Sequence, residues 1–245
     1  MPGPAPLFDN TDLRELNFTL AGESFSLLIV ADVCALAHGS VKFPEDDIYW
    51  GELWPAALAL AEAVLLGEVD LSTTPRSNLE IGCGTGLVSL SAARRLRKLG
   101  IHAGSPVIVA ADREERALKL VAANAERNGV KGYIATQRMD WSDAPPERFE
   151  RVLAADCLYQ PDSGWKLASF IRDAVHESPQ AFGIVADPQR WSARHFSTHA
   201  DKAGLSVLKK SRPVPIARGH GPVERIDVPT EPAALQADLF ELRRR

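Results

Sequence analysis

Short apolar runs alternate with longer helix-like stretches along most of this chain, and this alternation limits its fold more than any other feature. After residue 75 the apolar runs cover residues 77–82, 106–112, 133–140, 151–159 and 181–187. Amphipathic stretches of helical length, such as 87–100 and 113–129, separate them. Strands joined by such crossovers run parallel, with helices on both faces. The pattern predicts an α/β fold with a doubly wound, mostly parallel sheet, and residues 211–229 are predicted to be loops.

The residues before position 75 follow a different pattern. Residues 16–30 indicate two short strands around a glycine-containing turn, a hairpin outside the main sheet. Pro55 opens an Ala/Leu-rich stretch that closes at Gly67, as expected for a helix with proline in its first turn. We therefore divide the chain into an N-terminal extension, residues 1–74, and a core, residues 75–245, which together form one structural unit.

The composition is that of a globular protein, and it excludes several classes of partner. A net charge of −4 gives no general attraction to nucleic acids or to anionic membranes. The first ten residues lack the basic and apolar regions of a signal peptide. Three scattered cysteines, Cys34, Cys83 and Cys157, suit a reducing compartment. We expect a cytoplasmic monomer without nucleic-acid or membrane partners.

Acidic residues stand at the ends of several predicted strands. In an open parallel sheet the ligand crevice lies beyond the carboxyl ends of the strands, so these acids are expected to face it. They are Glu80, Asp112, Asp140 and Asp156. Asp112 ends the strand that follows the glycine-rich segment, where a carboxylate can accept hydrogen bonds from both ribose hydroxyls of a nucleoside. The alternative for Asp112 is a cap for the next helix, and the two roles are compatible.

The segment "LEIGCGTG" places Gly82, Gly84 and Gly86 directly after a predicted strand. A dinucleotide fingerprint would need a small residue at position 87, where this chain has leucine, and the Gly-Lys-Ser/Thr of a P-loop is absent. Glu80 would also repel a docked pyrophosphate. A cationic nucleoside reverses that sign, and S-adenosylmethionine carries a sulfonium and an ammonium. The glycines would then allow close approach of its methionyl portion.

Together with "VIVAAD" downstream, this segment resembles motif I and the next acidic strand end of the class I, seven-stranded S-adenosylmethionine methyltransferases, which have a Rossmann-like fold. "DDIYWGELWPAALALAEAV", "MDW" and "ADCLY" further resemble the family 16 group, over residues 45–205. That group includes protein-lysine methyltransferases. Asp156, Cys157, Leu158 and Tyr159 fit its Asp-x-x-Tyr motif.

The resemblance implies roles for five positions. Asp140 would approach the adenine amine, and Trp141 would lie against the adenine ring unless it only packs its loop. Trp54, in the N-terminal segment that covers the cofactor, would wall the adenosine or the substrate channel, or else anchor the start of a helix. Asp156 would capture the incoming amine, with Tyr159 as a wall of its channel. The alternatives are a strand-end cap for Asp156 and core packing for Tyr159.

The resemblance also implies an activity, an N-methyl transfer from S-adenosylmethionine to a lysine side chain of a protein substrate. A small-molecule amine is the alternative acceptor, and a partner-binding protein without turnover is a third possibility. Gln160 stands where members of the group often have glutamate. No metal is expected, because His195 and His199 lack a third ligand and the glutamate of a metalloprotease helix.

Overall fold

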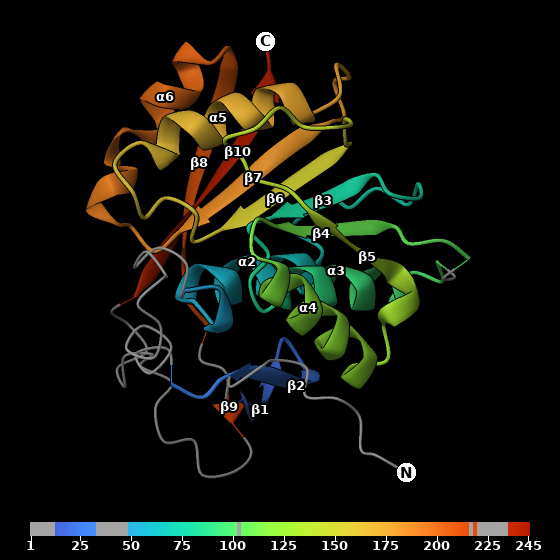
Figure 1. Ribbon diagram of the computed structural model, residues 1–245. Helices are drawn as coiled ribbons and strands as arrows, with labels where there is room; N and C mark the ends of the chain where they lie inside the picture. The colour runs from blue at the N-terminus through green and yellow to red at the C-terminus, as the bar shows by residue number, and fades with distance from the viewer. Residues whose placement is uncertain (1–12, 33–48, 102–103, 216–217, 220–234) are drawn as a thin grey trace, which may run out of the picture.

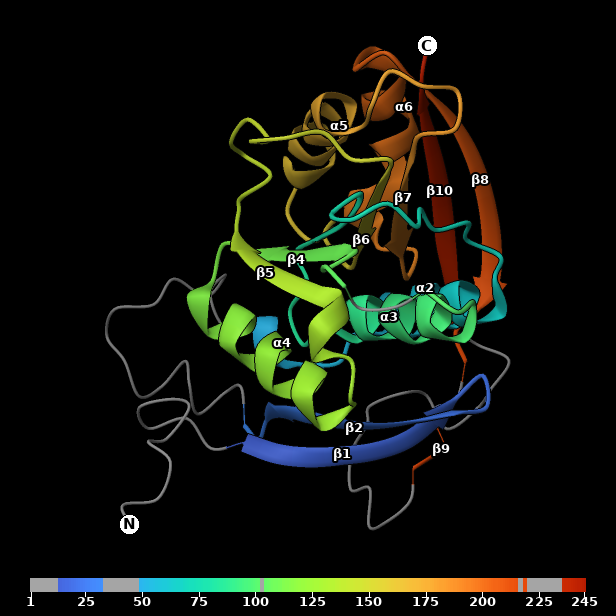
Figure 2. The same cartoon turned by 90° about the vertical axis from the view of Figure 1, so that its right-hand side faces the viewer.

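The computed structural model describes residues 13–32, 49–101, 104–215, 218–219 and 235–245. Within these ranges the molecule has four layers, seen from top to bottom in Figure 1. A pair of helices covers the main sheet from one side, and further helices cover it from the other. A small second sheet lies beneath those helices, and Figure 2 shows the same order from the side. Cys34 lies outside the described residues.

The main sheet of the described residues has seven strands in the order β5-β4-β3-β6-β7-β10-β8. The neighbouring pairs among β3 to β7 are parallel, whereas β10 is antiparallel to both of its neighbours. This confirms the predicted α/β class and the mostly parallel, Rossmann-like sheet of seven strands. The strands are β3 Asn78–Ile81, β4 Ile108–Asp112, β5 Ile134–Arg138, β6 Arg151–Ala155, β7 Phe182–Asp187, β8 Leu205–Pro213 and β10 Gln236–Arg244.

Burial along the strands explains why their sequences read as apolar runs. Every residue of β3, β4 and β7 is buried, because helices cover both faces of these central strands. Of the two edge strands, β5 exposes alternate residues to solvent, and β8 exposes several successive residues. The apolar runs therefore locate the middle of the sheet, and the edges carry a weaker signal.

The helices divide between the two faces of the sheet. Buried residues of α2 and α3 and part of α4 belong to one hydrophobic cluster, and those of α5 and α6 belong to a second. Ala117 and Leu120 of α4 form a small third cluster with Val30 and Trp50. Among the described helices, the longest has 13 residues and none has the length and apolar character needed to cross a bilayer. The helices are α2 Pro55–Leu66, α3 Leu87–Lys98, α4 Glu115–Arg127, α5 Ser163–Ala174 and α6 Phe196–Lys202, with short 3-10 turns η2 Tyr49–Gly51, η3 Lys131–Tyr133 and η4 Trp191–His195.

The start and end of α2 agree with the prediction. Pro55 occupies the first turn, and Gly67 caps the other end in the left-handed conformation, with φ of 78°. Residues 211–213 contradict the prediction of a loop over residues 211–229, because β8 continues through them to Pro213 and pairs with β10. This edge strand is rich in lysine, arginine and serine, so it lacks the apolar run that marks the central strands. Arg218–Gly219 also contradict the predicted loop, because they form a short strand, β9. Residues 216–217 and 220–229 of that loop lie outside the described ranges.

The predicted N-terminal hairpin is confirmed. Strands β1 Leu13–Leu20 and β2 Glu23–Val30 pair in register around Ala21 and Gly22, and both turn residues have positive φ, as in the tight turns that suit hairpins. The two-residue strand β9, Arg218–Gly219, adds to β1. Apolar side chains of the hairpin share one core with α2 and α3, so the hairpin is packed onto the main unit. The boundary at residue 74 remains a prediction.

Asn124 of α4 and Asn128, the C-cap of that helix, attach the hairpin. Asn124 accepts a hydrogen bond from Leu28 N and donates to Leu28 O, at 2.7 and 3.1 Å, and also donates to Thr85 O in the glycine-rich loop. Asn128 makes the same pair of bonds with the backbone of Ser26. The backbone N–H and C=O groups of Ser26 and Leu28 in β2 are thereby satisfied by side chains.

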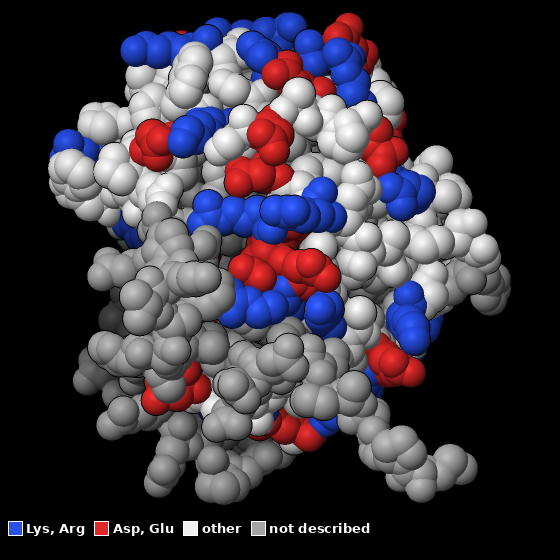
Figure 3. All heavy atoms as spheres, viewed as in Figure 1, with Lys and Arg blue, Asp and Glu red and all other residues white. Residues whose placement is uncertain are grey.

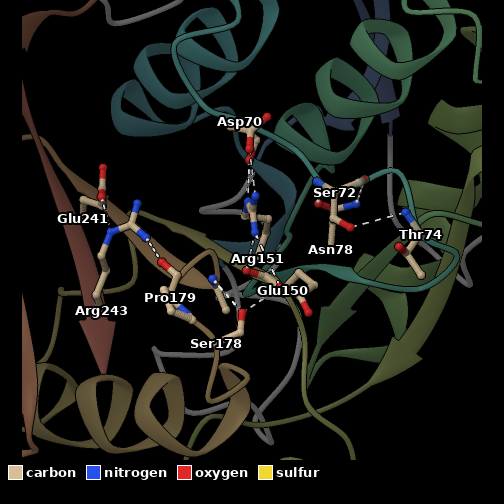
Figure 4. A network of polar contacts seen from close by, with 11 residues as sticks. Asp70, Ser72, Thr74, Asn78, Glu150, Arg151, Ser178, Pro179, Glu241 and Arg243 are labelled. Atoms are coloured by element: carbon tan, nitrogen blue, oxygen red, sulfur yellow. Dashed lines mark hydrogen bonds and ion pairs between the residues drawn. The ribbon is translucent and has the colours of Figure 1, made fainter. Parts of the chain in front are cut away.

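The amino end of β6 carries a buried arginine with fixed partners. Arg151 is 5% exposed and donates to Asp70 O, Asp70 Oδ2 and Glu150 O, at 2.5, 2.9 and 2.9 Å (Figure 4). Its Cζ also lies 4.4 Å from the ring centroid of Phe182. Nearby, Asn78 bonds to the backbone of Ser72, which ties the loop before β3 to the same end of the sheet.

Candidate active site

A pocket opens at the carboxyl ends of β3, β4, β6 and β7. It has a volume of about 420 Å³, within the usual range for small-molecule sites. Its aromatic lining residues are Tyr49, Trp50, Trp54, Trp141 and Tyr159. Its charged lining residues are Asp112, Arg113, Glu114, Asp156 and Arg190. The predicted crevice therefore exists at the predicted edge of the sheet.

The glycine-rich loop contributes two of its three glycines to the pocket, Gly82 and Gly84. Gly82 has φ of 68°, and a Cβ there would lie 2.7 Å from Cys157 Sγ and 3.0 Å from the ring of Trp141. Gly86 does not line the pocket, because its Cα faces α4, where a Cβ would lie 2.8 Å from Val121. Two glycines thus keep the wall of the pocket bare, and the third lets two helices approach.

Asp112 stands at the end of β4, in the pocket wall. Its Oδ2 accepts a hydrogen bond from Gly84 N and its Oδ1 accepts one from Glu114 N, both at 3.0 Å. Burial raises the pKa of this carboxyl, and the two backbone donors oppose that shift. The N-cap of α4 is Glu114, so Asp112 shapes the turn before the helix while it faces the pocket.

Glu80 points behind the loop. It is 3% exposed, does not line the pocket, and accepts hydrogen bonds from Ser89 N, at 2.8 Å, and from Ser89 Oγ. Burial raises the pKa of Glu80 to about 8, so its carboxyl is mostly protonated at pH 7. A neutral Glu80 does not repel a pyrophosphate. Glu114 is paired with the guanidinium of Arg116, so the electrostatic argument for a cationic ligand rests on Asp112 and Asp156, and not on Glu80.

Asp140 and Trp141 are neighbours with different positions. Asp140 lies outside the pocket lining, and its Oδ1 accepts a hydrogen bond from Ser142 N at 2.8 Å. Trp141 lines the pocket and meets Tyr159 edge to face, with ring centroids 6.5 Å apart. Tyr159 in turn meets Tyr49 at 6.3 Å, and Tyr49 meets Trp54 at 5.7 Å. Four aromatic rings are thus linked around the pocket.

Asp156 follows β6 and is 7% exposed, with a positive φ of 59° that is rare for a residue other than glycine. Its Oδ2 accepts a hydrogen bond from Ala56 N, at 2.7 Å, in the first turn of α2. Its Oδ1 contacts the guanidinium of Arg190. Burial raises the pKa of Asp156, although Arg190 and the backbone donors oppose the shift. The carboxylate therefore caps a helix and faces the pocket at the same time.

Arg190 is the main site residue that sequence reasoning missed. It lies just after β7, lines the pocket, and its Cζ is 5.6 Å from the ring centroid of Trp54. Besides Asp156, its Nη1 lies 3.6 Å from Asp187 Oδ2. The segment "DPQR" carried the signal, since a cation after a strand-end acid points to the same crevice. Tyr49, Trp50, Arg113 and Glu114 were also missed, although Tyr49 and Trp50 lie within a quoted stretch of the resemblance and Arg113 and Glu114 directly follow another.

The surface shows no single charged field on the face seen in Figure 3, where basic and acidic side chains alternate. Within the ranges that the structure describes, no three His, Cys, Asp or Glu side chains gather in a way that could hold a metal ion. The pocket itself offers aromatic rings and carboxylate and guanidinium groups.

The sequence is similar to a family profile and to a curated protein. A sequence profile described as lysine methyltransferase matches residues 46–203. The probable cobalt-precorrin-6B C(15)-methyltransferase (decarboxylating) of Pyrobaculum calidifontis is 35% identical over 109 residues, which are 44% of this chain and 50% of that protein. The chain thus spans half the length of the curated relative that it matches.

Solved structures share the fold. TrmN from Thermus thermophilus matches with a TM-score of 0.51 and 17% identity, over 77% of this chain and 49% of that chain. The cyclase SpnF matches with a TM-score of 0.52 and 14% identity, over 76% of this chain and 80% of that chain. At these identities the likeness concerns the fold alone.

Proposed function

The chain belongs to the lysine methyltransferase family, and from this premise we propose that it is an S-adenosylmethionine-dependent enzyme that methylates a lysine side chain of another protein. The observation that carries the proposal is the aromatic pocket that ends on the buried carboxylate of Asp156. Aromatic faces attract cationic amines, and a buried acid gives such an amine a partner. We further propose that the enzyme is a cytoplasmic monomer and needs neither nucleic acid nor a membrane.

The residues of the pocket fit a cationic nucleoside. Asp112 is placed to receive ribose hydroxyls, since its two oxygens retain further acceptor capacity beside their backbone donors. Gly82 leaves its face of the wall without a side chain, beside the ring of Trp141. When bound, S-adenosylmethionine supplies a methyl group on a sulfonium that leaves as a neutral thioether. Glu80 and Gly86 support the loop from behind, and the contact of Asp140 with adenine stays a proposal.

The difficult requirement is the protonation state of the acceptor. A lysine amine has a reference pKa near 10.4, so its deprotonation at pH 7 costs about 4 to 5 kcal/mol. Burial among aromatic rings lowers the pKa of an amine, whereas the carboxylate of Asp156 raises it. We propose that Asp156 captures and orients the amine and that Tyr159 forms one wall of the channel. The proton of the amine is released to solvent.

A small-molecule amine is the second candidate acceptor. The relative from Pyrobaculum calidifontis is named as a C(15)-methyltransferase of a precorrin, so its name supports a small molecule as acceptor but not an amine in particular. The same pocket would serve either acceptor, because only the mouth must differ. A protein without turnover is the third candidate, since one fold hosts unrelated chemistries.

The test is to incubate the protein with radiolabelled S-adenosylmethionine and a nuclease-treated lysate, and to identify the labelled molecule and residue. We expect a labelled protein band with the methyl group on a lysine. Label confined to small molecules would support the second candidate, and no label at all would support the third.

The matched variant is Asp156→Asn, because its amide oxygen can still accept from Ala56 N while the charge is lost. We expect labelling to fall at least about 100-fold, as for loss of a charged contact to the reacting amine, roughly 3 kcal/mol. Binding of S-adenosylhomocysteine should remain within about threefold of wild type, on the order of 0.6 kcal/mol. Loss of cofactor binding instead would mean that Asp156 serves the cofactor.

A further inference from the structure

We propose that Arg190 selects the acceptor: its guanidinium competes with the acceptor ammonium for Asp156, and Asp187 is the second partner to which Arg190 moves. The inference rests on the proposed function only in requiring that the acceptor be an amine. It assigns roles to two residues that lie outside the Asp-x-x-Tyr segment.

The first observation is that Asp156 has one oxygen to offer. Its Oδ2 is held by Ala56 N at the start of α2, where the partial positive charge of the helix end favours a carboxylate. Its Oδ1 carries the contact with Arg190. The backbone of Ala57 also donates to this carboxylate, so the start of α2 occupies its Oδ2 side. An amine from the pocket therefore meets Asp156 at Oδ1, where the guanidinium already lies.

The second observation is that Asp187 has an oxygen without a hydrogen bond. Asp187 is fully buried, and its Oδ1 accepts from Arg190 N at 2.7 Å. Its Oδ2 has no hydrogen-bond partner among the described residues, yet it lies 3.6 Å from Nη1 of Arg190. A buried acceptor without a donor is unfavourable, so it calls for an explanation. A shift of the guanidinium toward Oδ2 would satisfy it and would free Oδ1 of Asp156.

The third observation is the charge of this cluster. Two carboxylates, Asp156 and Asp187, face one guanidinium, so the cluster carries one negative charge when both acids are ionised. One additional cation balances it. The side chain of Arg190 is 26% exposed, which leaves it room to move, and the ring of Trp54 offers it a cation–π contact.

The cluster therefore discriminates by charge. An alkylammonium can replace the guanidinium on Asp156, because it brings the same charge and donors of similar strength. A neutral hydroxyl brings no charge, so it cannot displace Arg190 at comparable affinity. The structure thus favours amine acceptors over alcohol acceptors, and Arg190 sets that preference.

The experiment measures binding of n-butylammonium, a mimic of the lysine side chain, to the protein saturated with S-adenosylhomocysteine. Calorimetry gives the affinity, and the NMR signal of the Arg190 Nε–H group, assigned by its loss in Arg190→Lys, reports the movement. We expect butylammonium to shift this signal and n-butanol to leave it unchanged. Arg190→Gln removes the competitor, so it should bind butylammonium about tenfold more tightly. Arg190→Lys should stay near wild type.

Asp187→Asn removes the charge of the second partner and should weaken butylammonium binding about tenfold. The control is Arg194→Gln, which removes an exposed arginine that stacks on Trp191, 3.7 Å from its ring centroid, and should change nothing. Thermal unfolding of each variant checks that it is folded. Weaker binding in Arg190→Gln, or no measurable binding in both wild type and Arg190→Gln, would overturn the inference.

Failure of the inference and failure of the proposed function are distinguishable. Butylammonium binding needs no turnover, so it can follow the expected pattern even if no protein in the lysate is labelled. Conversely, a methylated lysine together with an Arg190→Gln variant that binds butylammonium more weakly would leave the function standing and remove the role of Arg190.

Discussion

Two arginines, one near each end of β6, differ in burial and in how completely their partners hold them. At the amino end, Arg151 is almost fully buried, and three acceptors from Asp70 and Glu150 hold its guanidinium. At the carboxyl end, Arg190 is partly exposed and faces two acids, of which one has an oxygen without a hydrogen bond. A complete set of partners stabilises a fold, whereas an incomplete set beside a pocket marks a place where a ligand can enter.

The pKa shifts follow the same division. Buried carboxyls with raised pKa values, Glu80, Asp112, Asp156 and Asp187, all lie toward the pocket end of the sheet. Burial is the leading cause in each case. A site that binds a cation can hold such buried acids, because the bound cation supplies the positive charge that stabilises their ionised form.

The largest expected effect concerns Glu80 and pH. Its pKa is about 8 when folded and 4.5 ordinarily, so between these values the folded state holds a proton that the unfolded state has lost. Stability should therefore fall as pH rises through this window, by about 1.4 kcal/mol per unit and on the order of 5 kcal/mol in all. Glu80→Gln should lack this decline.

The measurement is denaturant unfolding of wild type and Glu80→Gln from pH 4 to pH 9. The two curves should meet below pH 4.5 and separate above it, with the variant more stable. Because Glu80 lies behind the loop, the variant should bind S-adenosylhomocysteine within about threefold of wild type. A large loss of affinity would restore the predicted contact between Glu80 and the cofactor.

The second effect tests the amino end of β6. Arg151→Met removes three hydrogen bonds of a buried cation, so we expect the free energy of unfolding to fall by about 3 kcal/mol. The exposed pair of Arg148 and Glu177 gives the control, and Arg148→Met should cost less than about 1 kcal/mol. Urea denaturation measures both. If Arg151→Met instead weakened binding of S-adenosylhomocysteine to the folded protein, the contrast between the two ends would fail.

The third and smallest effect concerns Asp112. Asp112→Ala removes the proposed partner of the ribose hydroxyls, so the Kd for S-adenosylhomocysteine should rise about 30-fold, equal to about 2 kcal/mol. Glu114→Ala is the matched control, since it removes the same charge from the same rim and should change the Kd less than about threefold. Calorimetric titration gives both constants. Equal losses would mean that Asp112 acts only through its charge.

The central strands, the hairpin and the glycine-rich loop could be predicted because their signals are local. Fully buried strands require apolar runs, and the turn between β1 and β2 requires residues that tolerate positive φ. Strand β8 escaped prediction because it is an edge strand and mostly polar, and β10, between β7 and β8, escaped it because only some of its residues are buried. The strength of the signal thus followed the depth of burial.

The site was predictable by position and less so by contact. Asp112, Trp141, Asp156 and Tyr159 reach the pocket because each follows or ends a strand of the sheet. The pairing of Asp156 with Arg190 joins residues 34 positions apart, and nothing local in the sequence specifies it. Glu80 shows a second limit, since position at a strand end does not say to which side a carboxyl points.

The asparagines that attach β2 to α4 have a consequence for how the protein behaves in a crowded solution. β2 is an outer strand of its sheet, and a bare outer strand offers its N–H and C=O groups to the strands of other molecules. Here the amides of Asn124 and Asn128 occupy such groups at Leu28 and Ser26. These amides pair with the outer edge of β2 in place of a neighbouring strand, which protects the hairpin from edge-to-edge aggregation.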